Sequence, residues 1–394
     1  MEHEHENGSS QMVRGQTTYR VRGVPGSGVQ PTEKTQARDW EASLRLSSKD
    51  HHFLDHALAL DVAVDLLTSK RSFDDPGVAP NYLPELSMRA ENDASLWQVG
   101  VDSKVVWFVP NHQTELSPRV AVTYFVQSGG EDQLLAAASE ISRLSLDVGI
   151  GVEHLWTLFD GFTFGPGVRM DAWLPQSSDS FLTQANQPEV SPRLIVHWDL
   201  ESWRIYANAG RRHRFPTLLE LYGDNIGIGP SPGLESESGL FGDIGLGCEL
   251  DVGHELEVDL AFTTFVSLPR NLIVFMQNSQ NSVKALNVAQ STLAGIETSL
   301  NAEWAWLDLN AHYSFIHARD TGDVTGLEGN TPPGIAQHQL DLGLRVGPDW
   351  LRLGWDLNFR SQRFLDQANL RPLPGSALQA LSLQLYFEPI SIYF

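Results

Sequence analysis

The stretch that decides the fold runs from Arg143 to Glu153 and reads RLSLDVGIGVE. Its even positions are all Leu, Val or Ile, whereas its odd positions are Arg, Ser, Asp, Gly or Glu. Apolar residues at every second position lie on one face of a β-strand, and the residues between them lie on the other. The stretch therefore predicts a strand with one wholly apolar face.

The same alternation recurs along most of the chain. Clear examples span residues 57–66, 119–126, 255–262, 307–315, 339–346 and 351–359. We count about 14–16 such segments between Trp40 and the end, and the spacing typical of helices is rare. Many are roughly 9–13 residues long, which exceeds the average globular strand and suits a tilted strand that crosses a bilayer.

The connections and the side-chain composition favour the same fold. Tight turns such as Asp251–Gly253 alternate with long polar loops at Ser69–Ser95, Asp320–Ala336 and Arg360–Gly375. The polar faces are rich in Gly, Ala, Ser, Asp and Arg, and tryptophans cluster near strand ends, as in outer-membrane barrels. We predict an all-β fold, an antiparallel transmembrane β-barrel with about 14–16 strands of a larger receptor barrel.

Two domains of unequal size are expected. Residues 1–38 are predicted to be a disordered or loop-like segment with at most one strand, and residues 39–394 to be the barrel. The opening residues MEHEHENGSSQ lack the basic and apolar regions of a secretory leader.

Composition excludes several classes of protein. The 394 residues carry 27 Lys and Arg against 49 Asp and Glu, a net charge of −22. This balance argues against nucleic acid as a partner, because a protein needs cations to replace the phosphate counterions. A hydrophobic content of 41% argues against a disordered chain, and a single cysteine excludes a disulfide framework.

A set of short motifs lies between residues 214 and 247. The chain reads RFPTLLELYG at Arg214–Gly223, PSPGLESES at Pro230–Ser238 and GDIGLG at Gly242–Gly247. This resembles TonB-dependent outer-membrane receptors, whose motif runs R-x-P-[ST]-x-x-E-L-Y, then N-P-x-L-x-P-E, then E-x-G. The matching residues are Arg214, Pro216, Thr217, Glu220, Leu221, Tyr222, Pro232, Leu234, Glu237 and Gly245. Ser231, Ser236 and Asp243 stand where the family has Asn, Pro and Glu.

Further blocks follow in the order of the family. The stretch NVAQSTLAGIE resembles N-x-G-x-A-x-x-x-G-[VI]-E through Asn287, Gly295 and Glu297. The stretch PPGIAQHQL resembles P-G-x-P-x-H-x-L through Pro333, Gly334 and His338. Phe364, Asp366 and Asn369 then occupy positions where the family often has an aromatic residue, Asp and Asn.

The resemblance implies a function and a set of partners. Receptors of this family import iron chelates, cobalamin or similar nutrients across the outer membrane. The expected partners are outer-membrane lipid, a nutrient ligand such as a siderophore or cobalamin, and an inner-membrane energy-coupling protein. The resemblance implies no catalytic residues, cofactor, resident metal or nucleic acid, and it leaves the ligand-contacting residues unassigned.

The resemblance also implies parts that the chain does not show. Family members carry an energy-coupling box and a plug domain before the barrel, and neither is visible before Trp40. The last residues, Glu388–Phe394, resemble the start of the penultimate strand rather than the closing one. We therefore expect a truncated barrel without its plug. A plugless passive pore, a soluble β-sandwich binding module and a non-functional fragment stay open as alternatives.

Overall fold

The computed structural model of the chain describes residues 2–4, 10–23, 36–53, 57–75, 90–128, 141–176, 188–224, 228–253, 256–277, 283–322, 326–348, 350–387 and 390–393. The main sheet contains β1 (Glu2–Glu4), β2 (Ser10–Gly23), β3 (Gln36–Phe53), β4 (Leu58–Asp75), β5 (Ala90–Val109), β6 (His112–Ser128), β7 (Ile141–Phe159), β8 (Phe162–Gln176), β9 (Glu189–Leu200), β10 (Trp203–Arg214), β12 (Glu237–Val252), β13 (Leu256–Arg270), β16 (Ser291–Trp304), β17 (Leu307–Asp320), β18 (His338–Val346), β19 (Leu351–Arg360), β22 (Ser376–Phe387) and β23 (Ile390–Tyr393). The remaining elements are α1 (Leu218–Tyr222), β11 (Ile228–Gly229), β14 (Leu272–Gln277), β15 (Val283–Ala289), β20 (Arg363–Phe364) and β21 (Pro372–Leu373).

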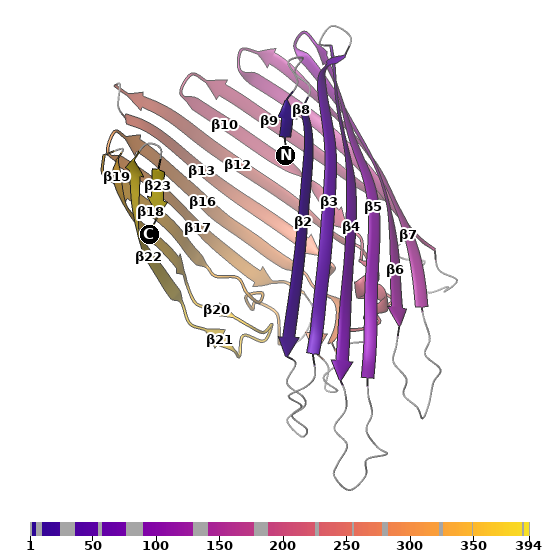
Figure 1. Cartoon of the computed structure of the whole chain (residues 1–394). Coiled ribbons are helices and arrows are strands. Elements are labelled where there is room, and N and C mark those ends of the chain that lie inside the picture. The colour runs from indigo at the N-terminus through magenta and orange to yellow at the C-terminus, as the bar shows by residue number, and fades with distance from the viewer. Residues whose placement is uncertain are drawn as a thin grey trace.

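The main sheet is an antiparallel meander in which each strand pairs with the next strand of the sheet along the chain (Figure 1). It has eighteen strands, and sixteen of them are long, from 9 residues in β18 to 20 residues in β5. The all-β antiparallel prediction and the predicted strand number are thus confirmed. Figure 1 shows the sheet curled into a wall, with β1 and β2 at one edge and β22 and β23 at the other. Within the described residues no pairing joins these two edges, so the wall is open.

Two expected boundaries differ from those in the structure. Residues 1–38, expected to be mostly loop, contain β1, β2 and the first residues of β3. The stretch Ser69–Ser95, expected to be a loop, is strand at both ends, because β4 continues to Asp75 and β5 begins at Ala90. Pairing between neighbouring strands satisfies the backbone whatever the side chains are, so polar strands extend beyond the apolar pattern.

The apolar residues of the alternating pattern lie on the outer face of the curled sheet. On β7, Ile150 is 49% and Val152 is 43% exposed, whereas Ser145 on the opposite face is 2% exposed. A β-sandwich would bury the apolar faces of two sheets against each other. Here a single long sheet turns its apolar face outward, so the soluble β-sandwich alternative is wrong. The opposite, concave face is called the lumenal face below.

Strand β5 gives the height of the outer apolar band. Trp97, Val99, Val101 and Trp107 share the outer face and are all at least 40% exposed. The two tryptophans are ten positions apart. At about 3.3 Å per residue and a tilt of about 40°, they bracket a band roughly 25 Å tall, which is the height of a membrane barrel's apolar band. None of the helices in the described part of the chain has the length and hydropathy to cross a membrane.

Two glycines of the motif blocks lie beneath aromatic rings of neighbouring strands. Gly245 on β12 pairs with Tyr206 on β10, and a Cβ at Gly245 would overlap the Tyr206 ring. The Tyr206 hydroxyl forms a 2.6 Å hydrogen bond with Thr263 on β13. Gly295 on β16 pairs in the same way with Phe265 of β13, whose ring also occupies the place of a Cβ. The glycines therefore make room for rings that tie three adjacent strands together.

Candidate functional site

Helix α1 lies in the long connection between β10 and β12, which we call the strap (residues 215–236). Thr217 caps the helix, because its hydroxyl accepts a 3.2 Å hydrogen bond from the Glu220 amide. The Glu220 carboxylate accepts a 2.8 Å hydrogen bond from the Thr217 amide, which completes a capping box. Gly223 ends the helix with a φ of 75°, a conformation that favours glycine. Sequence reasoning placed this segment in a connection and missed the helix, although the T-x-x-E pattern followed by glycine was its signal.

A three-residue ionic clamp joins the strap to the strands from which it leaves. The Arg214 guanidinium, at the end of β10, contacts both oxygens of Glu220 at 2.9 and 3.1 Å. It also contacts both oxygens of Glu237, the first residue of β12, at 2.8 and 2.7 Å. Glu237 in turn accepts a 2.7 Å hydrogen bond from the amide of Ile273. Charge-assisted bidentate pairs fix both distance and orientation, so this clamp sets how the strap leaves the wall.

Asn287 fixes the second half of the strap. Its side-chain oxygen accepts a 2.8 Å hydrogen bond from the Glu235 amide, and its side-chain nitrogen donates to the Glu235 carbonyl at 3.0 Å. The same nitrogen donates to the carbonyl of Asn271 at 2.7 Å, and Asn271 has a φ of 54°. A side-chain amide can satisfy both groups of a peptide at once, which explains an Asn at this position.

The strap packs against the lumenal face of strands far along the sheet. Leu221 is 0% and Leu218 is 3% exposed, and they form an apolar cluster with residues of β5, β6 and β8. The cluster members are Ala94, Phe125, Trp173, Leu218, Leu221, Leu234 and Ala285. The strap begins after β10 and reaches strands four or more places away in the sheet. It therefore lies inside the curve of the wall.

Polar contacts hold the far end of the strap on the same wall. Asp224, which is 2% exposed, accepts a 3.0 Å charged hydrogen bond from Arg71 of β4. Gln127 of β6 donates to the carbonyls of Tyr222 and Gly223. The Arg143 guanidinium lies 4.8 Å from the centre of the Tyr222 ring, within range for a cation–π contact.

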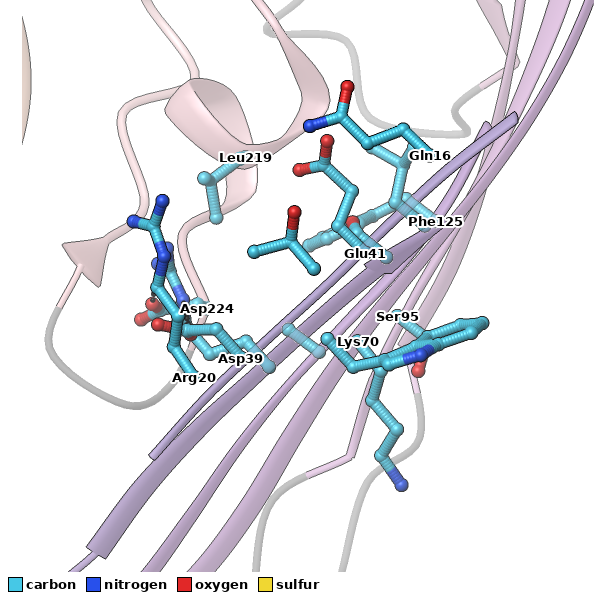
Figure 2. A pocket seen from close by; sticks show the side chains of 15 residues that line it. Gln16, Arg20, Asp39, Glu41, Lys70, Ser95, Phe125, Leu219 and Asp224 are labelled. Carbon is cyan, nitrogen blue, oxygen red and sulfur yellow. Dashed lines mark hydrogen bonds and ion pairs between the residues drawn. The ribbon is translucent and has the colours of Figure 1, made fainter. Parts of the chain in front are cut away.

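A cavity of 490 Å³ lies between the strap and the lumenal face of β2–β6. Ala94, Leu96, Phe125 and Leu219 supply its apolar surface. Its polar residues on the lumenal face are Gln16, Thr18, Arg20, Asp39, Glu41, Ser69, Arg71 and Asp224. Figure 2 shows Glu41 and Gln16 on the same side of the strands as Leu219, whereas Lys70 and Ser95 project from the opposite side.

The charges in this cavity divide into paired and unpaired groups. Arg71 bridges Asp224 and Asp39, with its Nε 3.0 Å from an oxygen of Asp39. Among the described residues, Arg20 and Glu41 have no ion-pair partner. An exposed guanidinium and carboxylate beside an apolar floor can bind a compact ligand that carries both polar and apolar parts.

The residues of the motif blocks are distributed over three places. Arg214, Thr217, Glu220 and Glu237 form the clamp; Leu221, Tyr222, Leu234, Pro216 and Pro232 belong to the strap; and Asn287 anchors it. Glu297 lies farther along the sheet, in a lumenal hollow with Tyr206 and Thr263.

The third block lies apart from the strap. Gly334 donates its amide to the carbonyl of Phe364 at 2.8 Å, and His338 Nδ1 lies 2.9 Å from the Tyr313 hydroxyl. Asn369 bonds both the amide and the carbonyl of Thr331, at 2.9 and 2.8 Å. Pro333 precedes Gly334 in this loop, so the block joins residues 326–337 to residues 361–375.

Most motif residues therefore shape the loops, and different residues line the cavity. Arg20, Glu41, Phe125 and Leu219 were not singled out from the sequence, because they stand outside the motif blocks or at variable positions within them. Their one signal was a place on the polar face of an alternating strand, which is shared by dozens of other residues.

Comparisons with known proteins agree with this architecture. The family model described as TonB dependent receptor-like, beta-barrel matches residues 17–393. The FrpB iron transporter from Neisseria meningitidis (F5-1 variant) is similar at a TM-score of 0.72 and 12% identity, over 97% of this chain and 64% of that one. The ferric yersiniabactin uptake receptor FyuA from Yersinia pestis is similar at a TM-score of 0.70 and 13% identity, over 98% of this chain and 61% of that one.

A third similar structure is the copper transporter OprC, with a TM-score of 0.69 and 14% identity, over 96% of this chain and 63% of that one. The chain thus spans slightly less than two thirds of the length of these solved structures. At such low identities the likeness shows the fold alone.

Proposed function

The chain belongs to the TonB-dependent receptor-like β-barrel family, and from this premise we propose that it forms the wall of an outer-membrane importer of a scarce nutrient. The ligand classes we propose are an iron chelate, cobalamin or a similar compact nutrient. The proposed partners are outer-membrane lipid on the apolar face and an inner-membrane protein that supplies energy.

The observation that carries this proposal is the lumenal cavity beside the strap. A passive pore needs only a polar lumen, whereas a receptor needs a site that holds its ligand. The cavity offers an apolar floor from Phe125 and Leu219 and unpaired charges from Arg20 and Glu41. Iron transporters and a copper transporter are among the structures with this fold, which supports a small metal-containing or chelated ligand.

The test is nutrient-dependent growth of a Gram-negative host that lacks its own receptors and produces the full polypeptide containing this chain. Growth is measured on a panel of ferric chelates and on cobalamin, with and without the host's energy-coupling protein. We expect growth on one ligand class only, and only when the coupling protein is present. Growth on unrelated solutes that is independent of the coupling protein would instead identify a passive pore.

A matched pair of variants ties uptake to the cavity. Arg20→Gln removes an unpaired lumenal charge, whereas Lys70→Gln removes a charge that projects from the opposite side of the strands (Figure 2). For an anionic ligand, loss of a charge-assisted contact weakens binding by roughly tenfold. We expect Arg20→Gln to reduce ligand binding to the purified protein by about that factor. Equal effects of both variants would argue against the cavity.

A further inference from the structure

The strap is held at its two ends by contacts of different kinds. At its root, the clamp of Arg214, Glu220 and Glu237 ties it to β10 and β12, the strands that it connects. At its far end, Asp224 and the carbonyls of Tyr222 and Gly223 are held by residues of β4 and β6. The root contacts move with the strap's own strands, whereas the far contacts must break if the strap leaves the opposite wall.

The far contacts can break without leaving a charge stranded. Arg71 keeps its ion pair with Asp39 at 3.0 Å when Asp224 leaves. Asp224, which is 2% exposed in the observed state, would regain water. Breaking a buried pair is costly mainly when one partner stays buried and uncompensated, and that does not happen here. Two states of similar free energy are therefore available to the strap.

The position of the strap makes this movement relevant to passage through the lumen. In the observed state the strap reaches from β10 to Arg71 on β4, six strands away in the sheet, and so crosses the inside of the curve. Leu219 and Asp224 of the strap also form one side of the cavity. Release of the far end would open the cavity and widen the lumen together.

We infer that the strap is a gate, rooted by the Arg214 clamp and latched shut by the contacts of Arg71 and Gln127 with residues 222–224. This inference rests on the proposed function only in requiring that solutes pass along the lumen. The latch is the step that sets how often the passage opens.

The test measures whether the wall beneath the strap becomes accessible. Ala94→Cys places a thiol on β5 under α1, where the native side chain is 6% exposed. Ala121→Cys is the matched control, because Ala121 is 1% exposed but lies outside the apolar cluster of the strap. Both are made in a Cys248→Ser background, and the full chain in lipid vesicles is labelled with a water-soluble maleimide.

Latch variants are then added to each thiol. Asp224→Asn weakens the contact with Arg71, and Gln127→Ala removes the contacts with the two carbonyls while keeping the ion pair. Arg45→Gln is the control, because Arg45 pairs with Asp65 on the same two strands and does not contact the strap. Each latch variant is expected to label Ala94→Cys roughly tenfold faster, because a lost charged or paired contact shifts an opening equilibrium by about that factor.

The results separate a gate from a fixed strap. The expected result is faster labelling at position 94 only, together with a higher conductance of the same variants in planar bilayers. Unchanged labelling at position 94, equal acceleration at positions 94 and 121, or faster labelling without higher conductance would each overturn the inference. No nutrient or coupling protein enters this test, so a failure of the proposed import function leaves its outcome unaffected.

Discussion

Arg214 makes more charged contacts than any other residue of the strap's root, since it binds both oxygens of Glu220 and both of Glu237. Arg214→Ala would leave two acidic groups, which are 9% and 17% exposed, beside each other without a cation. The arginine itself is 40% exposed, so water offsets part of the loss. We expect a loss of roughly 2 kcal/mol in unfolding free energy, below the cost of breaking a fully buried pair.

Urea unfolding of the detergent-solubilised chain measures this change. Arg45→Ala serves as the control, because its single pair with Asp65 is exposed on both sides and is expected to contribute less than about 1 kcal/mol. If the two variants unfold at the same urea concentration, the clamp does not stabilise the strap.

Gly245 tests whether the motif glycines exist to make room for rings. Gly245→Ala places a methyl group into the Tyr206 ring, and we expect it to destabilise the sheet by about 1–3 kcal/mol. The double variant with Tyr206→Ala removes the overlap and is expected to be more stable than the sum of the two single effects predicts. Thermal unfolding of the four proteins of this cycle measures the coupling, and strict additivity would contradict the explanation.

At the scale of the element, α1 is too short to be stable alone, so its packing must hold it. Leu221 is 0% exposed within the cluster, and Leu221→Ala is expected to cost about 3 kcal/mol through the cavity that it leaves. Leu370→Ala is the matched control, because Leu370 is 79% exposed in the loop between β20 and β21. Denaturant unfolding should show no measurable loss for the control.

The strands could be predicted from the sequence, and the strap could not, for a physical reason. Side chains on a strand alternate between two environments, so residues such as Leu144 to Val152 record the fold in a period of two. The strap depends instead on contacts such as that between Arg71 and Asp224, which lie 153 positions apart and leave no periodic pattern. The resemblance located Arg214 and Glu220 in a shared motif, but their bidentate contact became visible only in the structure.

At the scale of the whole molecule, the outer apolar band predicts a dependence on depth. Val101 lies on the outer face of β5 between Trp97 and Trp107, whereas Val109 lies beyond Trp107. Val101→Arg is expected to destabilise the folded state by about 2–4 kcal/mol in lipid, and Val109→Arg by about 0–1 kcal/mol. Unfolding in phospholipid vesicles measures both, and equal losses would mean that the band does not span the bilayer at this height.

The count of sixteen long strands carries one geometric consequence. Neighbouring strands run in opposite directions throughout the meander, so β2 at one edge and β22 at the other also run in opposite directions. Antiparallel joining of these edges therefore obeys a parity rule. They can meet directly, or through an even number of intervening strands, whereas an odd number would force one parallel pair into the ring.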